Sequence, residues 1–230
     1  MNKNIHRIKA GITNVYLVEN GENSILIDAG NKNKAHKILK KIRKVGLKPD
    51  SIAAIIITHT HYDHVGSLPE LKQLTNAKVI AHSADEESLK AGFTDLPEGT
   101  NSLFRFIVGL GRKFLKTHGS FTPSEPDILI NEKYDLKDFD LDAFIIPTPG
   151  HTAGSVSLII NREHAFIGDT AFNIKGRSLY PPFANDEKAL KRSWETLLNT
   201  GVKHFWPGHG KKFSREKFSK NYRKVDPKLH

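Results

Sequence analysis

The sequence predicts an α/β protein, a four-layer sandwich in which two similar halves turn their sheets toward each other. Short apolar runs of strand length recur along the 230 residues, and amphipathic helical stretches lie between them. Two of these runs have a counterpart later in the chain. Residues 25–28 (I-L-I-D) resemble residues 165–169 (A-F-I-G-D), and residues 55–59 (I-I-I-T-H) resemble residues 144–147 (F-I-I-P), which His151 follows shortly. Two such βα halves, packed sheet against sheet, form four layers.

Length and composition indicate one domain, residues 1–230. No apolar run approaches the roughly 20 residues that a membrane span needs, and the N-terminus lacks the apolar stretch of a secretory signal. We therefore expect a cytoplasmic protein without a membrane partner. The absence of cysteine excludes disulfides, thiolate metal ligands and a cysteine nucleophile. The net charge is +10. The lysines of residues 34–44, however, fall on the solvent-exposed face of a predicted amphipathic helix and do not form a binding stripe, which argues against nucleic acid as a partner.

Turn and burial signals define the elements of the first half. Residues 13–19 and 24–28 read as two strands, joined by an Asn20-Gly21 turn that tolerates the positive φ of a tight hairpin. The continuous apolar run within residues 51–58 is typical of a strand that is buried on both faces. The remaining predictions are helices over residues 32–45, 68–75 and 84–91 and a strand over residues 78–81.

Residues 92–126 differ in composition from the rest of the chain, because glycines and prolines surround a predicted helix over residues 101–116. We interpret this segment as an inserted flap or cap. The elements predicted after it are strands over residues 128–130, 143–146, 155–160, 165–167 and 204–206 and a helix over residues 186–199. Residues 211–230 form a basic C-terminal tail, for which we expect a helix or a mobile segment.

Four residues that can bind metal ions lie within six positions, in the motif H-T-H-Y-D-H: His59, His61, Asp63 and His64. They directly follow the buried strand, where a loop presents side chains at the strand's carboxyl end. His59 and His61 are two positions apart on extended backbone and therefore point the same way. If the chain then turns into a helix, Asp63 and His64 project at a second point nearby. This arrangement predicts a metal site instead of an ordinary polar loop.

Three more residues of ligand type follow predicted strands of the second half: His151 in P-G-H-T, Asp169 in G-D-T and His209 in P-G-H-G. A glycine or proline stands beside each, which allows close backbone approach or fixes the turn. One such turn alone is weak evidence. Three in series after H-x-H-x-D-H indicate a single metal centre.

With these motifs the chain resembles the metallo-β-lactamase superfamily. The resemblance rests on I-L-I-D-A-G, T-H-T-H-Y-D-H-V-G, P-G-H-T-A-G-S, G-D-T and P-G-H-G, which span residues 28–210. It implies an αββα sandwich and two metal ions. His59, His61 and His151 would bind the first ion, Asp63, His64 and His209 would bind the second, and Asp169 would bridge the two. The resemblance also implies that Asp28 orients one of the ligand histidines from behind.

The chemistry implied by the resemblance is hydrolysis at a dinuclear centre. Two divalent ions about 3.5–4 Å apart lower the pKa of a bridging water, so a metal-bridging hydroxide is available at neutral pH for attack. Asp63 would act as a catalytic residue by passing a proton to the leaving group. We expect Zn²⁺ as the metal, with Fe or Mn as alternatives, and a small-molecule substrate with an ester, thioester or lactone bond. Tyr180, in S-L-Y-P-P-F, is a candidate to bind that substrate, and packing against the following prolines is the alternative for it.

Other functions stay open at this level. A phosphodiesterase or nuclease of the same superfamily would suit the charge of +10, although no added recognition domain is visible. A hydroxyacylglutathione hydrolase would need a C-terminal helical domain, for which the 20 residues after Gly210 are too few. A non-enzymatic module with a structural metal would need a closed, four-coordinate site, and seven clustered ligands favour catalysis instead. The sequence does not specify the oligomeric state, and a homodimer is one option.

Overall fold

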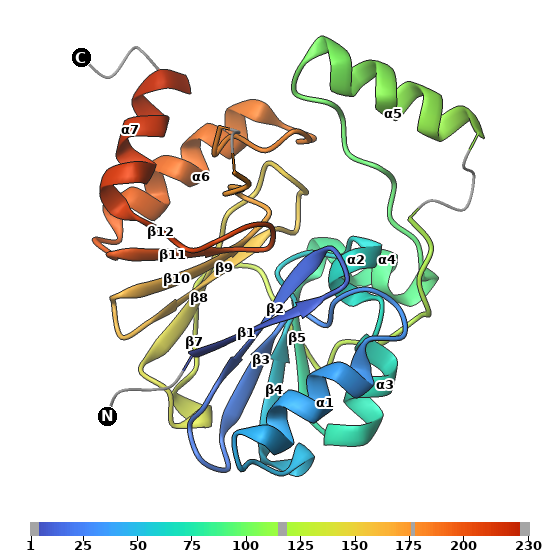
Figure 1. Cartoon of the computed structure of the whole chain (residues 1–230), viewed down its shortest axis with the longest axis vertical. Helices are drawn as coiled ribbons and strands as arrows, with labels where there is room; N and C mark the ends of the chain where they lie inside the picture. Colours follow the sequence, from blue (N-terminus) through green and yellow to red (C-terminus); the bar gives the residue numbers. More distant parts are fainter. Residues whose placement is uncertain (1–4, 115–118, 176–177, 226–230) are drawn as a thin grey trace.

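The computed structural model describes residues 5–114, 119–175 and 178–225. Two six-stranded sheets face each other, and helices cover the outer face of each sheet (Figure 1). This αββα order of layers confirms the fold that the sequence predicts.

The first sheet has the strand order β1-β2-β3-β4-β5-β6. β1 to β3 are antiparallel, and β3 to β6 run parallel. The strands are β1 (Ile5–Ala10), β2 (Thr13–Val18), β3 (Ser24–Ile27), β4 (Ile52–Ile56), β5 (Lys78–His82) and β6 (Ile128–Ile130). The helices of this half are α1 (Ala35–Lys44), α2 (Tyr62–Val65), α3 (Leu68–Thr75) and α4 (Glu86–Ala91), with short 3-10 helices at η1 (Pro49–Ser51) and η2 (Ser83–Asp85).

The second sheet has the order β12-β11-β10-β9-β8-β7, and all its pairs are antiparallel except β10 with β11. Its strands are β7 (Tyr134–Asp135), β8 (Ala143–Pro147), β9 (Val156–Ile160), β10 (His164–Gly168), β11 (His204–Pro207) and β12 (Phe213–Ser214). The 3-10 helix η3 (Lys137–Phe139) lies between β7 and β8, and the outer helices are α6 (Glu187–Asn199) and α7 (Arg215–Val225).

Three apolar cores hold the layers together, and β4 shows how one strand serves two of them. Ile55 packs into the core beneath α1 together with Ile38, whereas the next residue, Ile56, faces the second sheet and packs into the core that contains Leu158. Successive side chains of a strand point to opposite faces, so a strand between two cores must be apolar throughout. The prediction of a strand buried on both faces is confirmed. A third core joins the second sheet to α6 and α7.

The structure adds strands that the sequence analysis did not predict: β1, β7 and β12. β7 and β12 have two residues each, too few to show a periodicity. The expected helix over residues 84–91 is divided between η2 and α4. For the basic tail we expected a helix or a mobile segment, and residues 215–225 form the helix α7. Residues 226–230 lie outside the described part of the chain.

The predicted flap contains α5 (Ser102–Phe114), which stands outside the two sheets (Figure 1). The last residues of the helix predicted over 101–116 lie outside the described part of the chain. Leu103, Phe106 and Leu110 of α5 are exposed, so this helix does not seal a core along its whole length. Within the described residues, no helix combines the length and the apolar character that crossing a membrane would need.

Candidate metal centre

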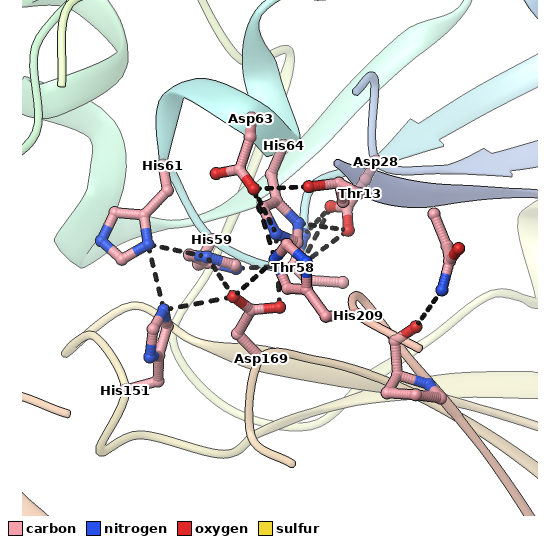
Figure 2. Close-up of polar contacts among 12 residues, drawn as sticks. Thr13, Asp28, Thr58, His59, His61, Asp63, His64, His151, Asp169 and His209 are labelled. Carbon is pink, nitrogen blue, oxygen red and sulfur yellow. Dashed lines mark hydrogen bonds and ion pairs between the residues drawn. The ribbon is translucent and has the colours of Figure 1, made fainter. Parts of the chain in front are cut away.

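The H-T-H-Y-D-H motif lies where the sequence analysis expected it, directly after β4 at the carboxyl end of the parallel strands. The backbone stays extended through His61 and then turns into the single-turn helix α2, which carries Asp63 and His64. His151, Asp169 and His209 reach the same region from loops of the second sheet. Figure 2 shows the seven side chains together between the two halves. All seven predicted ligands therefore belong to one cluster.

Three imidazole nitrogens converge on one point. His61 Nδ1 lies 3.0 Å from His59 Nε2 and 3.0 Å from His151 Nε2. Burial lowers the pKa of all three side chains. The neighbouring imidazoles, above all His64, lower the pKa of His59 further. Burial and the neighbouring His151 together lower the pKa of His61 to about 3. The three rings are therefore neutral at pH 7, the state in which imidazole binds a metal.

The tautomer of His151 is set by the backbone, since its Nδ1 lies 2.9 Å from the Phe183 carbonyl oxygen and donates to it. The lone pair is then on Nε2, which points at the other two nitrogens (Figure 2). Three lone pairs held this close repel one another unless a cation lies among them. This group fits a metal ion.

A second group consists of Asp63, His64 and His209, whose ligand atoms lie within 4.8 Å of one another. His209 Nε2 is 3.3 Å from Asp63 Oδ2, and His64 Nε2 is 3.9 Å from the same oxygen. Burial by itself lowers the pKa of both histidines, but the surrounding carboxylates, above all Asp169, have a larger effect in the opposite direction. As a result, the pKa of His209 is raised to about 9, and the pKa of His64 is raised well above its ordinary value. A divalent ion bound here would displace these protons.

Asp169 lies between the two groups. Its Oδ1 is 3.3 Å from His64 Nε2, and its Oδ2 is 3.2 Å from His209 Nε2 and 3.6 Å from His151 Nε2. Although burial raises the pKa of this carboxyl, the charges of His209 and His64 hold it well below its usual range, so Asp169 stays ionised. One carboxylate thus faces both groups, as a bridging ligand must.

Unsatisfied polar atoms give an independent indication that the cluster is built for ions. Among the described residues, the buried His64 Nε2 and Asp169 Oδ1, which face each other in the cluster, have no hydrogen-bond partner. The same is true of His61 Nε2, the ring nitrogen opposite the converging Nδ1, and of Asn14 Oδ1, which is not a predicted ligand. A buried polar group without a partner costs about 1–3 kcal/mol, and a bound cation removes that cost for a ligand atom. Gly208 keeps the space open, because a Cβ there would lie 2.3 Å from Asp169 Oδ1.

Asp28 lies behind the second group, at the end of β3. Its Oδ2 is 2.8 Å from His64 Nδ1, and its Oδ1 accepts hydrogen bonds from the backbone N–H and the hydroxyl of Thr58, at 2.8 and 2.9 Å. Its backbone φ of +63° is rare for a residue with a side chain, and such strain persists where surrounding contacts impose it. The carboxylate can therefore orient His64, with Nε2 directed into the cluster (Figure 2).

Tyr180, the candidate substrate residue, makes its described side-chain contacts with residues outside the ligand cluster. Its hydroxyl donates to Glu187 Oε2 at 2.8 Å, and its ring packs against Trp194 with the ring centroids 5.7 Å apart. Tyr180 is half-buried in the wall of a cavity of about 570 Å³, which we call the apolar cavity. A role of its hydroxyl toward a substrate stays a prediction.

The apolar cavity is linked to the ligand cluster through one of its lining residues, Phe172. Most of its lining is apolar, including Leu103 and Phe104 within α5 and Phe172 in the loop after β10. The Phe172 ring stacks on the His209 imidazole, with centroids 4.7 Å apart and planes 28° apart. An apolar group in this cavity would therefore contact Phe172, the residue that stacks on a predicted ligand.

Two supporting residues were missed by the sequence analysis. The hydroxyl of Thr13 donates to Asp63 Oδ2. Asp85 is buried and hydrogen-bonded to Thr60, between His59 and His61; burial raises its pKa to about 7, against the lowering effect of the Thr60 hydrogen bonds. Neither residue carries a motif, because Thr13 begins β2 and Asp85 ends η2, and the fold alone brings them to the ligand loop.

Comparisons with known proteins agree with this geometry. A family profile of the metallo-beta-lactamase superfamily matches residues 8–209. The probable metallo-hydrolase M6_Spy0554 of Streptococcus pyogenes serotype M6 is 31% identical over 200 residues, which cover 86% of this chain and 78% of that protein. The probable metallo-hydrolase MJ0888 of Methanocaldococcus jannaschii is 32% identical over 215 residues, 90% of this chain and 92% of that protein.

Solved structures share the fold. ST1585 from Sulfolobus tokodaii, an archaeal metallo-beta-lactamase superfamily protein, aligns with a TM-score of 0.68 and 23% identity over 98% of this chain and 87% of its own. BLEG-1, a B3 metallo-beta-lactamase, aligns with a TM-score of 0.72 and 21% identity over 96% of this chain and 99% of its own.

Proposed function

We propose that this chain, which belongs to the metallo-β-lactamase superfamily of metal-dependent hydrolases, uses two divalent metal ions in catalysis. The reaction would be hydrolysis of a carbonyl bond of the ester, thioester or lactone type. One observation carries the proposal. Asp169 presents its two oxygens to both ligand groups, so the seven side chains form one continuous set of donors for two neighbouring ions.

His59, His61 and His151 would hold the first ion, and Asp63, His64 and His209 the second. The donors are nitrogen and oxygen only, which suits Zn²⁺ and also Fe or Mn. When bound, two such ions make water acidic enough to supply hydroxide at neutral pH and polarise the bond under attack.

Asp63 is suited to proton transfer at this centre. Burial raises its pKa, but His64 and the hydrogen bond with His209 outweigh that effect and hold the pKa below the usual range. Asp63 is therefore a carboxylate at neutral pH, able to accept the proton of the attacking water and to return it to the leaving group. The hydrogen bond from Thr13 fixes its orientation.

The site favours a small substrate with an apolar acyl portion. The apolar cavity of about 570 Å³ is lined by Phe172, which stacks on His209, and its size is in the range of small-molecule sites. The substrate would place its acyl portion in this cavity and its carbonyl over the ligand cluster.

Metal content and activity test the proposal together. Protein saturated with Zn²⁺ and dialysed is expected to retain two ions per chain by mass spectrometry, and Asp169→Asn to retain fewer. On a panel of esters, thioesters and lactones, His59→Ala should lower kcat/KM by more than about 100-fold, because removing a ligand affects activity at least as strongly as removing its support.

His36→Ala is the matched control, since His36 is an exposed histidine on α1 and lies outside the cluster. It should keep both ions and full activity. A saturated stoichiometry of one ion in a fully active protein would refute the dinuclear centre. Full activity of His59→Ala would refute the site itself.

A further inference from the structure

A second cavity, of about 600 Å³, adjoins the ligand cluster on another side. We call it the basic cleft, because five of its lining side chains are cationic: Arg7, Lys9, Lys175, Lys211 and Lys217. They come from distant parts of the chain, namely β1, the loop after β10, the loop after β11 and α7. The fold therefore gathers this charge at one place.

Within the described residues, none of these five side chains forms an ion pair with a carboxylate. Those with a hydrogen bond use neutral oxygens: Arg7 donates to the Gly210 carbonyl at 2.9 Å, Lys9 to the Ile12 carbonyl at 2.7 Å and Lys217 to Asn173 Oδ1 at 2.6 Å. Burial lowers the pKa of Lys9, and the positive charges of Arg7 and Lys37 lower it further. The cleft thus holds positive charge that the described part of the chain leaves uncompensated.

The basic cleft and the apolar cavity are neighbours that share a lining residue, and the basic cleft includes the predicted ligand His209. His209 lines the basic cleft, and Phe172 of the apolar cavity stacks on the same imidazole. Ile174 lines both cavities. A molecule that lies across His209 would therefore have an apolar environment on one side and a cationic environment on the other.

We propose that the basic cleft binds a phosphate-bearing leaving group of the substrate, while the apolar cavity holds the acyl portion. This inference rests on the proposed hydrolase function and names the substrate class of the same site. A phosphate dianion matches several converging cations better than a single carboxylate does, and an arginine can bind its oxygens in a bidentate manner.

A small amphiphile fits this arrangement better than a nucleic acid. A nucleic-acid backbone needs a basic surface along its length, whereas one of the two cavities here is apolar. In the reaction water adds to the acyl carbon, the bond from that carbon to sulfur or oxygen breaks, and the proton passes to the leaving atom. The products are a carboxylic acid and a phosphate-bearing thiol or alcohol.

Two thioesters with the same acyl chain test the specificity. Octanoyl-coenzyme A carries phosphates, and octanoyl-N-acetylcysteamine does not. We expect kcat/KM for the first to exceed that for the second at least about tenfold, since each hydrogen bond between a cationic side chain and a phosphate oxygen strengthens binding by about that factor.

The variant Lys175→Gln/Lys211→Gln should reduce this ratio at least about tenfold, as two phosphate contacts are lost. The control Lys40→Gln/Lys44→Gln removes the same charge from the exposed face of α1 and should leave the ratio within twofold. Equal kcat/KM values for the two thioesters in the wild-type protein, or an unchanged ratio in the cleft variant, would overturn the proposal.

A binding experiment separates failure of this inference from failure of the hydrolase proposal. Adenosine 3′,5′-bisphosphate has no thiol and no scissile acyl bond, and calorimetry measures its Kd for the Zn²⁺-loaded protein. Kd should rise at least about tenfold in Lys175→Gln/Lys211→Gln at equal metal content and should not change in the control.

If this result is obtained while neither thioester is cleaved, the cleft proposal stands and thioester hydrolysis is wrong. Absence of binding to the wild-type protein, or equal Kd values in all variants, would overturn the cleft. Tighter binding of a 20-nucleotide RNA, lost in the same variant, would also overturn it in favour of a nucleic-acid site.

Discussion

At the scale of single residues, the centre depends on groups that hold the ligands without being ligands. Asp28 accepts hydrogen bonds from the backbone N–H and the hydroxyl of Thr58 and from His64 Nδ1, the ring nitrogen that faces away from the cluster. The hydroxyl of Thr13 donates a hydrogen bond to Asp63. Asp85 supports the loop between His59 and His61 through Thr60. Space around Asp85 is so limited that a Cβ on Gly154 would lie 2.3 Å from its Oδ1. The loop geometry is therefore imposed by packing and by buried carboxyl groups.

The buried carboxyl of Asp85 leads to a pH dependence. Burial raises its pKa to about 7, above its unfolded value of 3.8, so the folded state keeps the proton that the unfolded state loses. The resulting stabilisation is complete below pH 3.8 and is lost as pH rises through 7; it amounts to at most about 4 kcal/mol. In metal-free protein, Asp85→Asn should therefore gain Tm relative to the wild type between pH 5 and pH 8.

The difference in Tm between the two proteins is the quantity to measure, because the histidines contribute to both curves alike. A difference that is the same at pH 5 and pH 8 would show that Asp85 ionises freely in the folded protein.

At the scale of elements, the C-terminal helix α7 is part of the fold and not an appendage. Phe218 is fully buried, and its ring centroid lies 4.6 Å from those of Trp194 in α6 and Phe205 in β11. The same helix carries Lys217 to the basic cleft. One face of α7 thus belongs to a core, while another residue contributes to the cleft.

Replacing Phe218 by alanine should lower the free energy of unfolding by about 3–5 kcal/mol, the usual cost of removing a buried phenylalanine. Chemical denaturation measures the effect. Phe106→Ala is the matched control, since Phe106 on α5 is 69% exposed and should change stability by less than about 0.5 kcal/mol. Equal effects of the two substitutions would mean that α7 does not stabilise the core.

The helix α7 also shows how far the sequence predicts the elements. The strand β4 was predicted because its apolar run is unbroken, whereas the basic residues around Phe218 conceal the apolar face of α7. β1 was missed because Arg7 and Lys9 interrupt its apolar pattern on the exposed face. The seven predicted ligands could be selected because each follows a strand within a motif, and their assignment as ligands stays a prediction. Thr13 and Asp85 have no such signal, since their contacts arise only when elements distant in the sequence, β2 and η2, pack beside the ligand loop.

At the scale of the whole molecule, the metal centre joins the two halves of the sandwich. His59 to His64 belong to the half built on the first sheet, and His151, Asp169 and His209 belong to the half built on the second. Direct hydrogen bonds also join the halves near the site, among them Tyr16 Oη to the Pro207 carbonyl at 2.7 Å and the Val156 N–H to the Thr58 carbonyl at 2.9 Å. Bound ions would therefore act as cross-links between the two sheets.

Removal of the metal should consequently lower global stability and not only activity. A ligand that binds only the folded state stabilises it by RT ln(1 + [L]/Kd), which is about 4 kcal/mol at a free concentration 1,000 times Kd. Calorimetric scans of Zn²⁺-loaded protein and of protein treated with a chelator should differ in Tm by at least several degrees. Asp169→Asn should lose most of this difference, because one carboxylate serves both groups of ligands. If the metal-loaded and metal-free proteins unfold at the same temperature, the ions do not hold the halves together, and the unsatisfied buried atoms of the cluster must be stabilised in another way.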